Sequence, residues 1–197
     1  MSGPIVIVPL VIVLGGAILA VVAWFWPAAR RLPITRLAWL LAAAPLATFG
    51  FTLWLVAQTG NGQAYTVSFD WIPSLGLRAC LYFDTLSGLF ALLVTGIGTL
   101  VMVYTGYYFK GTTAPKASQF SEPGAGPAIS ADNHARFLAY LLLFMFAMLG
   151  VVMAGDVITL FLFWELTSIT SFLLIAYKTK DEAARRGGLK SLLITGG

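Results

Sequence analysis

Long apolar runs alternate with shorter polar segments along most of the chain. Five runs begin near Pro4, Leu37, Leu81, Phe137 and Gly155. Each is close to the roughly 20 residues that a helix needs to cross the hydrocarbon core of a bilayer. A sixth apolar run opens near the end of the sequence and stops after a few residues. The pattern predicts an all-α polytopic membrane protein with about five complete spans and the start of a sixth.

The polar segments set the expected divisions of the chain. Alternating and turn-forming residues between 66 and 76 predict a short extramembrane hairpin between the second and third spans. We expect helices 1–2 in residues 1–57, an external hairpin loop in 58–80, helix 3 in 81–109, a flexible cytoplasmic loop in 110–136, helices 4–5 in 137–177, and a cytoplasmic loop with the start of helix 6 in 178–197.

Composition and charge support this interpretation. The chain is 59% hydrophobic and 10% charged, which leaves too little polar surface for a soluble domain. Every basic residue except Arg78 lies in residues 27–36, 110–136 or 178–190. The positive-inside rule therefore places these three loops in the cytoplasm and the N-terminus outside. Basic residues confined to such loops argue against a nucleic-acid partner. The single cysteine, Cys80, allows no intrachain disulfide and no metal cluster.

Glu165 is the candidate functional residue, because it lies near the middle of the fifth apolar run. A carboxylate at that depth costs on the order of 3 kcal/mol or more. Helical spacing predicts an apolar stripe that includes Leu162, Leu166 and Ile169, with Glu165 on its flank and Ser168 beside it. Ser168 can hydrogen-bond the carboxylate or hold water near it. Such a Glu either transfers protons or, when protonated, only bonds a neighbouring helix.

Three other ionisable residues are candidates for a supporting role. Asp84 opens the third apolar run, where capping the helix and assisting ion entry are the two alternatives. His134 precedes the fourth run, either solvated or feeding protons inward. Lys190 begins the incomplete sixth run, as a snorkelling anchor or as part of a charge relay. We find no nucleophile arrangement, phosphate loop or cofactor site that would indicate an enzyme.

Several segments, taken in order, resemble a known family. They are Asp70–Gly76 (DWIPSLG), Phe83–Gly98, Phe144–Met153, Phe163–Ile175 (FWELTSITSFLLI) and Lys190–Thr195. This series resembles the N-terminal part of the A subunit of Mrp-type multisubunit cation/proton antiporters, a family similar to the antiporter-like subunits of complex I and of membrane-bound hydrogenases.

The resemblance implies a bundle of inverted five-helix repeats. It also implies that Glu165 matches an essential carboxylate, which in the family pairs with a Lys on a later helix. The implied function is exchange of Na⁺ for H⁺ across a bacterial or archaeal cell membrane, with the other subunits of a complex as partners. Two alternatives remain open: a proton-pumping subunit of a complex I-type or hydrogenase assembly, and a truncated structural or assembly subunit.

Overall fold

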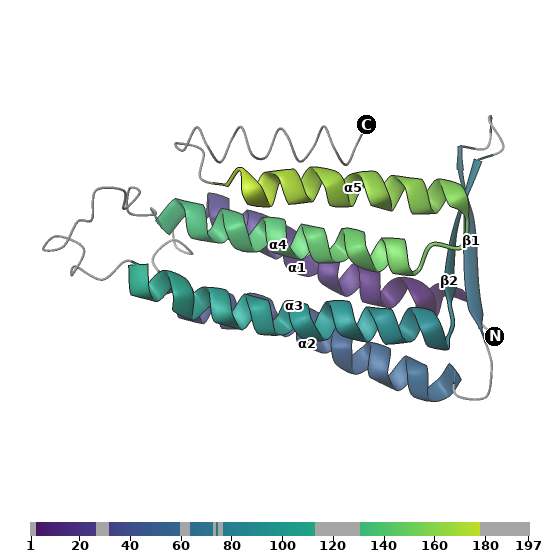
Figure 1. The fold of residues 1–197 in the computed structure, drawn as a ribbon, viewed down its shortest axis with the longest axis horizontal. Coiled ribbons are helices and arrows are strands. Elements are labelled where there is room, and N and C mark those ends of the chain that lie inside the picture. Colours follow the sequence, from purple (N-terminus) through teal and green to yellow (C-terminus); the bar gives the residue numbers. More distant parts are fainter. Residues whose placement is uncertain are drawn as a thin grey trace, which may run out of the picture.

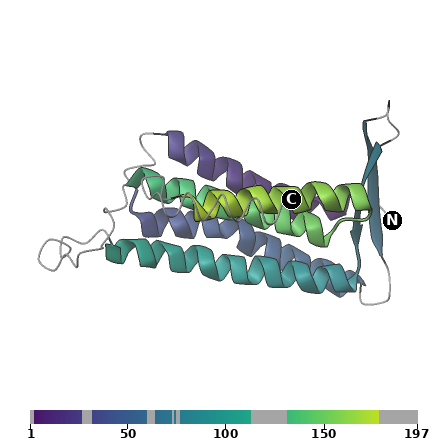
Figure 2. The ribbon, with the colours of Figure 1, turned by 45° about the horizontal axis from the view of Figure 1, so that its top comes forward.

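The computed structural model describes residues 3–26, 32–59, 64–72, 74, 77–112 and 131–177. Within these ranges, five helices are long and apolar enough to cross a membrane. Figure 1 shows them lying side by side along one direction, with a two-stranded hairpin across one end of the bundle. The turned view in Figure 2 keeps the hairpin at that end. The predicted polytopic helical fold, with a hairpin between the second and third spans, is confirmed.

The elements follow one another in a simple up-and-down order. In sequence they are the 3-10 helix η1 (Gly3–Ile7), α1 (Val8–Phe25), α2 (Ile34–Thr59), β1 (Tyr65–Ile72), β2 (Leu77–Phe83), α3 (Thr85–Thr112), α4 (Ala131–Val152) and α5 (Val157–Ile175). Helices are the expected solution here, because a helix satisfies its own backbone hydrogen bonds where no water is available.

Several expected boundaries differ from the structure by a few residues, with α2 ending at Thr59 and α3 at Thr112. Residues 81–83 were expected to open the third span but belong to β2, where Leu81 and Phe83 are buried and Tyr82 is exposed. This two-residue alternation is strand geometry, which a short apolar run does not distinguish from a helix start. At the other end of the bundle, α4 begins at Ala131, so residues 131–136 of the expected loop are helical. The expected start of a sixth span lies outside the described residues.

The hairpin presents one apolar face and one polar face. In its antiparallel register, Val67 lies opposite Leu81, and Asp70 lies opposite Arg78. The Arg78 Nε atom is 2.9 Å from the Asp70 Oδ1 atom, but both side chains are mostly exposed, so the pair adds little stability. The apolar face, with buried Leu81, packs into the same core as the helices. The hairpin is therefore part of the bundle and not a free loop.

Glycines allow the helices to approach closely, as expected for membrane helices. Three glycines of α3 each face a neighbouring helix: Gly88 faces Val56, Gly96 faces Phe49, and Gly98 faces Met145. The sequence did not single out Gly150, which lies directly under the Phe163 ring and brings α4 against α5. The Phe146 and Phe163 rings, 5.6 Å apart, continue this contact.

The Gly150–Phe163 contact gives a direct test of the α4–α5 packing. An added Cβ at Gly150 would overlap the Phe163 ring, so Gly150→Ala should destabilise the protein by about 1–3 kcal/mol. The matched control is Gly50→Ala on α2, because no atom lies within 4 Å of a Cβ added there. The control should be neutral or slightly stabilising, since alanine is the better helix former. The measurement is the thermal unfolding midpoint of the purified protein, and equal midpoints would contradict the packing.

Candidate functional site

Glu165 lies on the side of α5 that turns away from the rest of the bundle. The α5 residue that packs on α4 is Phe163, and two helical residues correspond to a rotation of about 200°. The residues one turn before and after Glu165 are Phe161, 61% exposed, and Ile169, 47% exposed. Glu165 itself is partly buried. Among the residues that the structure describes, its carboxylate has no hydrogen bond and no ion pair.

The hydroxyl groups near Glu165 are bonded to the backbone of their own helix. The Ser168 hydroxyl donates to the Trp164 carbonyl at 3.4 Å, and the Thr167 hydroxyl donates to the same carbonyl at 2.6 Å. The expectation that Ser168 hydrogen-bonds Glu165 is therefore not met, because backbone carbonyls one turn back are the nearest acceptors for a helical Ser or Thr. Ser168 is 6% exposed, so it lies on the protein side of α5.

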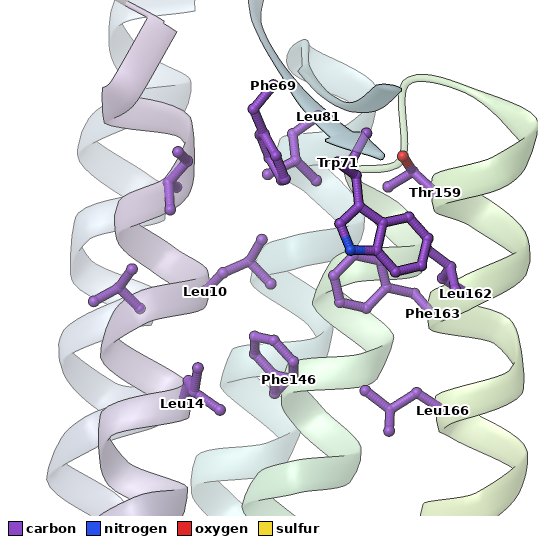
Figure 3. A pocket seen from close by; sticks show the side chains of 13 residues that line it. Leu10, Leu14, Phe69, Trp71, Leu81, Phe146, Thr159, Leu162, Phe163 and Leu166 are labelled. Atoms are coloured by element: carbon purple, nitrogen blue, oxygen red, sulfur yellow. The ribbon is translucent and has the colours of Figure 1, made fainter. Parts of the chain in front are cut away.

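Two grooves run along α5, one on each side of its contact with α4. The first has a volume of about 350 Å³ and is lined by hydroxyls and apolar side chains: Trp164, Thr167, Ser168 and Ser171 of α5, with Phe144, Met148 and Val151 of α4. The second, of about 520 Å³, lies between α1 and α5 below Phe69 and Trp71 of the hairpin (Figure 3). It is apolar except for Thr159. Glu165 lines neither groove.

Asp84 caps α3, which is one of the two roles that the sequence left open for it. Its Oδ1 atom accepts a hydrogen bond from the Ser87 amide at 2.7 Å. This bond lowers the pKa of the Asp84 carboxyl below its ordinary 3.8, with desolvation acting in the opposite direction. The stabilisation from the ionised cap is therefore present above pH 3.8 and is lost as the pH falls through the lowered pKa. The Asp84 carboxylate therefore has a structural function, which is to cap the first turn of α3.

Asp156 and Thr159 join the start of α5 to the hairpin. Asp156 is the N-cap of α5: its Oδ1 atom accepts from the Thr159 amide at 2.6 Å. The Thr159 hydroxyl donates to Asp156 Oδ2 at 3.0 Å and accepts from the Cys80 amide at 3.0 Å. Sequence analysis missed Thr159. Its spacing from Asp156 is a capping signal, but no sequence signal connects it to Cys80, which lies 79 positions away.

The remaining candidates lie at the end of the bundle opposite the hairpin or outside the described residues. His134 is in the first turn of α4 and only 3% exposed, so it is not the solvated histidine that one interpretation of the sequence expected. The structure does not bring His134 or Asp84 next to Glu165, since both lie at ends of the bundle while Glu165 lies mid-helix. Lys190 falls outside the described residues.

Asp156 offers a test of how α5 is anchored. Asp156→Ala removes the acceptor for both the Thr159 amide and the Thr159 hydroxyl, so it should cost about 1–2 kcal/mol of stability. Asp156→Asn keeps an N-capping oxygen and should cost much less. The readout is amide hydrogen exchange of the hairpin and of the first turn of α5. Exchange that rises equally in both variants would contradict the cap.

Five apolar spans, one of which carries a carboxylate in its interior, define a multi-pass helical membrane protein. Two family models match it. Residues 71–120 match the N-terminus of complex I chain 5, and residues 154–196 match the transmembrane part of the NADH:quinone oxidoreductase/Mrp antiporter family. The chain is therefore similar, over these two segments, to the antiporter-like proteins that these models describe.

Individual relatives agree. Over 161 residues the chain is 40% identical to Na⁺/H⁺ antiporter subunit A1 of Staphylococcus haemolyticus, and 39% identical to that of Staphylococcus aureus; each alignment covers 81% of this chain and 18% of the relative. The solved structure of the Mrp complex from Dietzia sp. DQ12-45-1b matches with a TM-score of 0.69 and 26% identity, over 96% of this chain and 17% of that chain. The predicted resemblance to the Mrp A subunit is confirmed. The chain spans less than a fifth of the length of these relatives.

Proposed function

We propose that this chain is the N-terminal part of a membrane subunit of a multisubunit monovalent cation/proton antiporter, in which Glu165 transfers protons within the membrane. One observation carries the proposal: Glu165 is a carboxylate inside a membrane span, within the residues that match the Mrp antiporter family model. The relatives' name, Na⁺/H⁺ antiporter subunit, supports Na⁺ as the exchanged cation. The proposed function is translocation without chemical catalysis.

The exposed side of α5 indicates that further protein packs against this chain. An ionised carboxylate facing lipid is too costly to be stable, so protein must cover the side of α5 that carries Glu165. Within the described ranges, the neighbours of Glu165 on that side are exposed apolar residues such as Phe161 and Ile169. We therefore place further helices against this side, from a longer chain or from other subunits of the complex. One of them supplies a positively charged partner for the carboxylate.

The mechanism follows from the electrostatics of a buried carboxylate. A nearby cationic side chain stabilises the ionised form of Glu165, and desolvation stabilises the protonated form. Movement of the cation away therefore draws a proton onto Glu165, and its return releases that proton. The equilibrium between the two arrangements couples proton movement to the cation that is exchanged. No bond other than the O–H bond of the carboxyl is made or broken.

The groove between α4 and α5 supplies a route for water to the proton-transfer site. Its hydroxyls, from Thr167, Ser168 and Ser171, lie on the flank of α5 next to the side that carries Glu165. Hydroxyls that donate to backbone carbonyls keep lone pairs that can accept hydrogen bonds from water. We propose that Ser168 supports proton transfer in this way, through water and not through a direct bond to the carboxylate.

The charge pattern supports one orientation in the cell membrane. The hairpin lies at the end of the bundle that carries Arg78, and the described basic residues Arg36 and Arg136 lie at the opposite end (Figure 1). The positive-inside rule then puts the hairpin and the N-terminus outside, and the opposite end in the cytoplasm.

A second candidate function is proton pumping within a redox-driven assembly. It is favoured by the match of residues 71–120 to the N-terminus of complex I chain 5. Both functions use the same carboxylate, and they differ in what drives the cycle.

The substitution Glu165→Gln tests the proposal, because it removes the titratable proton and keeps the shape of the side chain. In inverted membrane vesicles that contain the whole complex, Na⁺-dependent dissipation of the pH gradient should fall to the level of vesicles without the complex. Glu165→Asp should retain part of the exchange. The matched control is Asp84→Asn, which neutralises a carboxylate outside the spans and keeps the cap.

Native gels of the same membranes separate the alternatives. Unchanged exchange in an intact Glu165→Gln complex would contradict proton transfer by this residue. Loss of the complex itself would favour a structural function for the carboxylate. A pH gradient that does not respond to Na⁺ even in the unmodified complex would favour the redox-driven alternative.

A further inference from the structure

The end of the bundle opposite the hairpin contains a cluster of aromatic rings around Phe109 of α3. The Phe109 ring centroid lies 4.5 Å from that of His134 and 5.5 Å from that of Phe137, both on α4. Phe109 and Phe137 also contact Tyr177, just after α5, at 6.3 and 5.0 Å. The cluster therefore holds the ends of three helices together.

His134 is buried within this cluster with an unsatisfied ring nitrogen. Its side chain is 3% exposed, and its buried Nε2 atom has no hydrogen-bond partner in the part of the chain that the structure describes. A neutral imidazole can accommodate this environment among aromatic rings. An imidazolium has a second N–H donor and a full charge, and it would lose the water that normally stabilises both.

Among the side chains that the structure describes around His134, none favours its protonation. Tyr108 on α3, Tyr177 after α5, and Arg136 and Tyr140 on α4 are the titratable side chains described near it, and none is a carboxylate. His134 also lies in the first turn of α4, where the helix dipole is unfavourable to a cation. Attraction to the tilted Phe109 ring replaces only part of the lost hydration.

Arg136 connects the same cluster to α5 and α1. Its Nη2 atom donates to the Tyr177 carbonyl at 2.6 Å, and its guanidinium lies 6.0 Å from the Trp24 ring centroid of α1. A change in how the first turn of α4 packs is therefore transmitted to the last turn of α5, the helix that carries Glu165.

We propose that His134 is a proton-controlled latch, which holds the ends of α3, α4 and α5 together while its imidazole is neutral and loosens them when it is protonated. The closed latch favours the neutral imidazole, so its stability is fully present above about pH 6.5, the ordinary pKa of a histidine, and falls progressively below that value. His134 is the single histidine of this sequence, so comparison with a His134→Gln chain assigns the transition to it.

Cysteine labelling in the assembled complex tests the latch without measuring transport, so its outcome is independent of the function proposed for Glu165. The reporter is Ala135→Cys in a Cys80→Ala background, because Ala135 is buried next to His134. The rate of maleimide labelling is measured from pH 5 to pH 8. It is divided at each pH by the rate of the same reporter in a His134→Gln chain, which removes the effect of thiol ionisation.

The expected ratio is about one at pH 8 and rises below about pH 6.5, by up to about tenfold per pH unit for one coupled proton. A ratio that does not change with pH would overturn the proposal. His134→Phe, which fills the aromatic cluster and cannot be protonated, replaces His134→Gln if that variant does not assemble. The control is labelling of native Cys80, at the hairpin end, in a chain without the Ala135→Cys reporter. If the Cys80 labelling rate shows the same pH dependence, acid loosens the whole bundle, and the proposed latch is contradicted.

Discussion

Hydrogen bonds between the hairpin and the start of α5 fix the position of the helix that carries Glu165. Backbone groups of β2 bond the α4–α5 turn on both sides: the Tyr82 amide donates to the Met153 carbonyl at 2.8 Å, and the Gly155 amide donates to the Cys80 carbonyl at 2.8 Å. Thr159 adds a side-chain bond to the same strand. Unpaired backbone groups at a membrane boundary are costly, so this turn has one well-defined position.

The opposite end of α5 is held by a different kind of contact. Arg136 bonds the carbonyl of Tyr177, and aromatic rings from α3 and α4 pack against the Tyr177 ring. Between these two ends, Phe163 packs on Gly150 and Phe146, and Ser168 and Thr170 are buried. A helix fixed at both ends and packed along one side can present Glu165 on its other side at a constant depth. That geometry suits a carboxylate that exchanges protons with elements beyond this chain.

The two ends of the bundle also differ in chemistry. At the hairpin end, the side chains of Asp84 and Asp156 accept hydrogen bonds from helix amides and cap α3 and α5. At the other end, a buried imidazole and a guanidinium lie among aromatic rings, where added charge is poorly tolerated. Acid would therefore weaken both ends, but the Asp84 cap, whose pKa is lowered by its hydrogen bond to Ser87, persists to a far lower pH than a neutral imidazole does.

The sequence by itself determined the number and type of the spans, because about twenty apolar residues in a row have few stable states other than a membrane helix. It also indicated capping as one of two roles for Asp84, since capping depends on residues three positions apart, and it singled out Glu165 by its depth. Tertiary structure alone decided that residues 81–83 are strand, that Thr159 bonds Cys80, and that His134 is buried under Phe109. Each of these depends on a partner far away in the sequence, and local periodicity carries no information about such a partner.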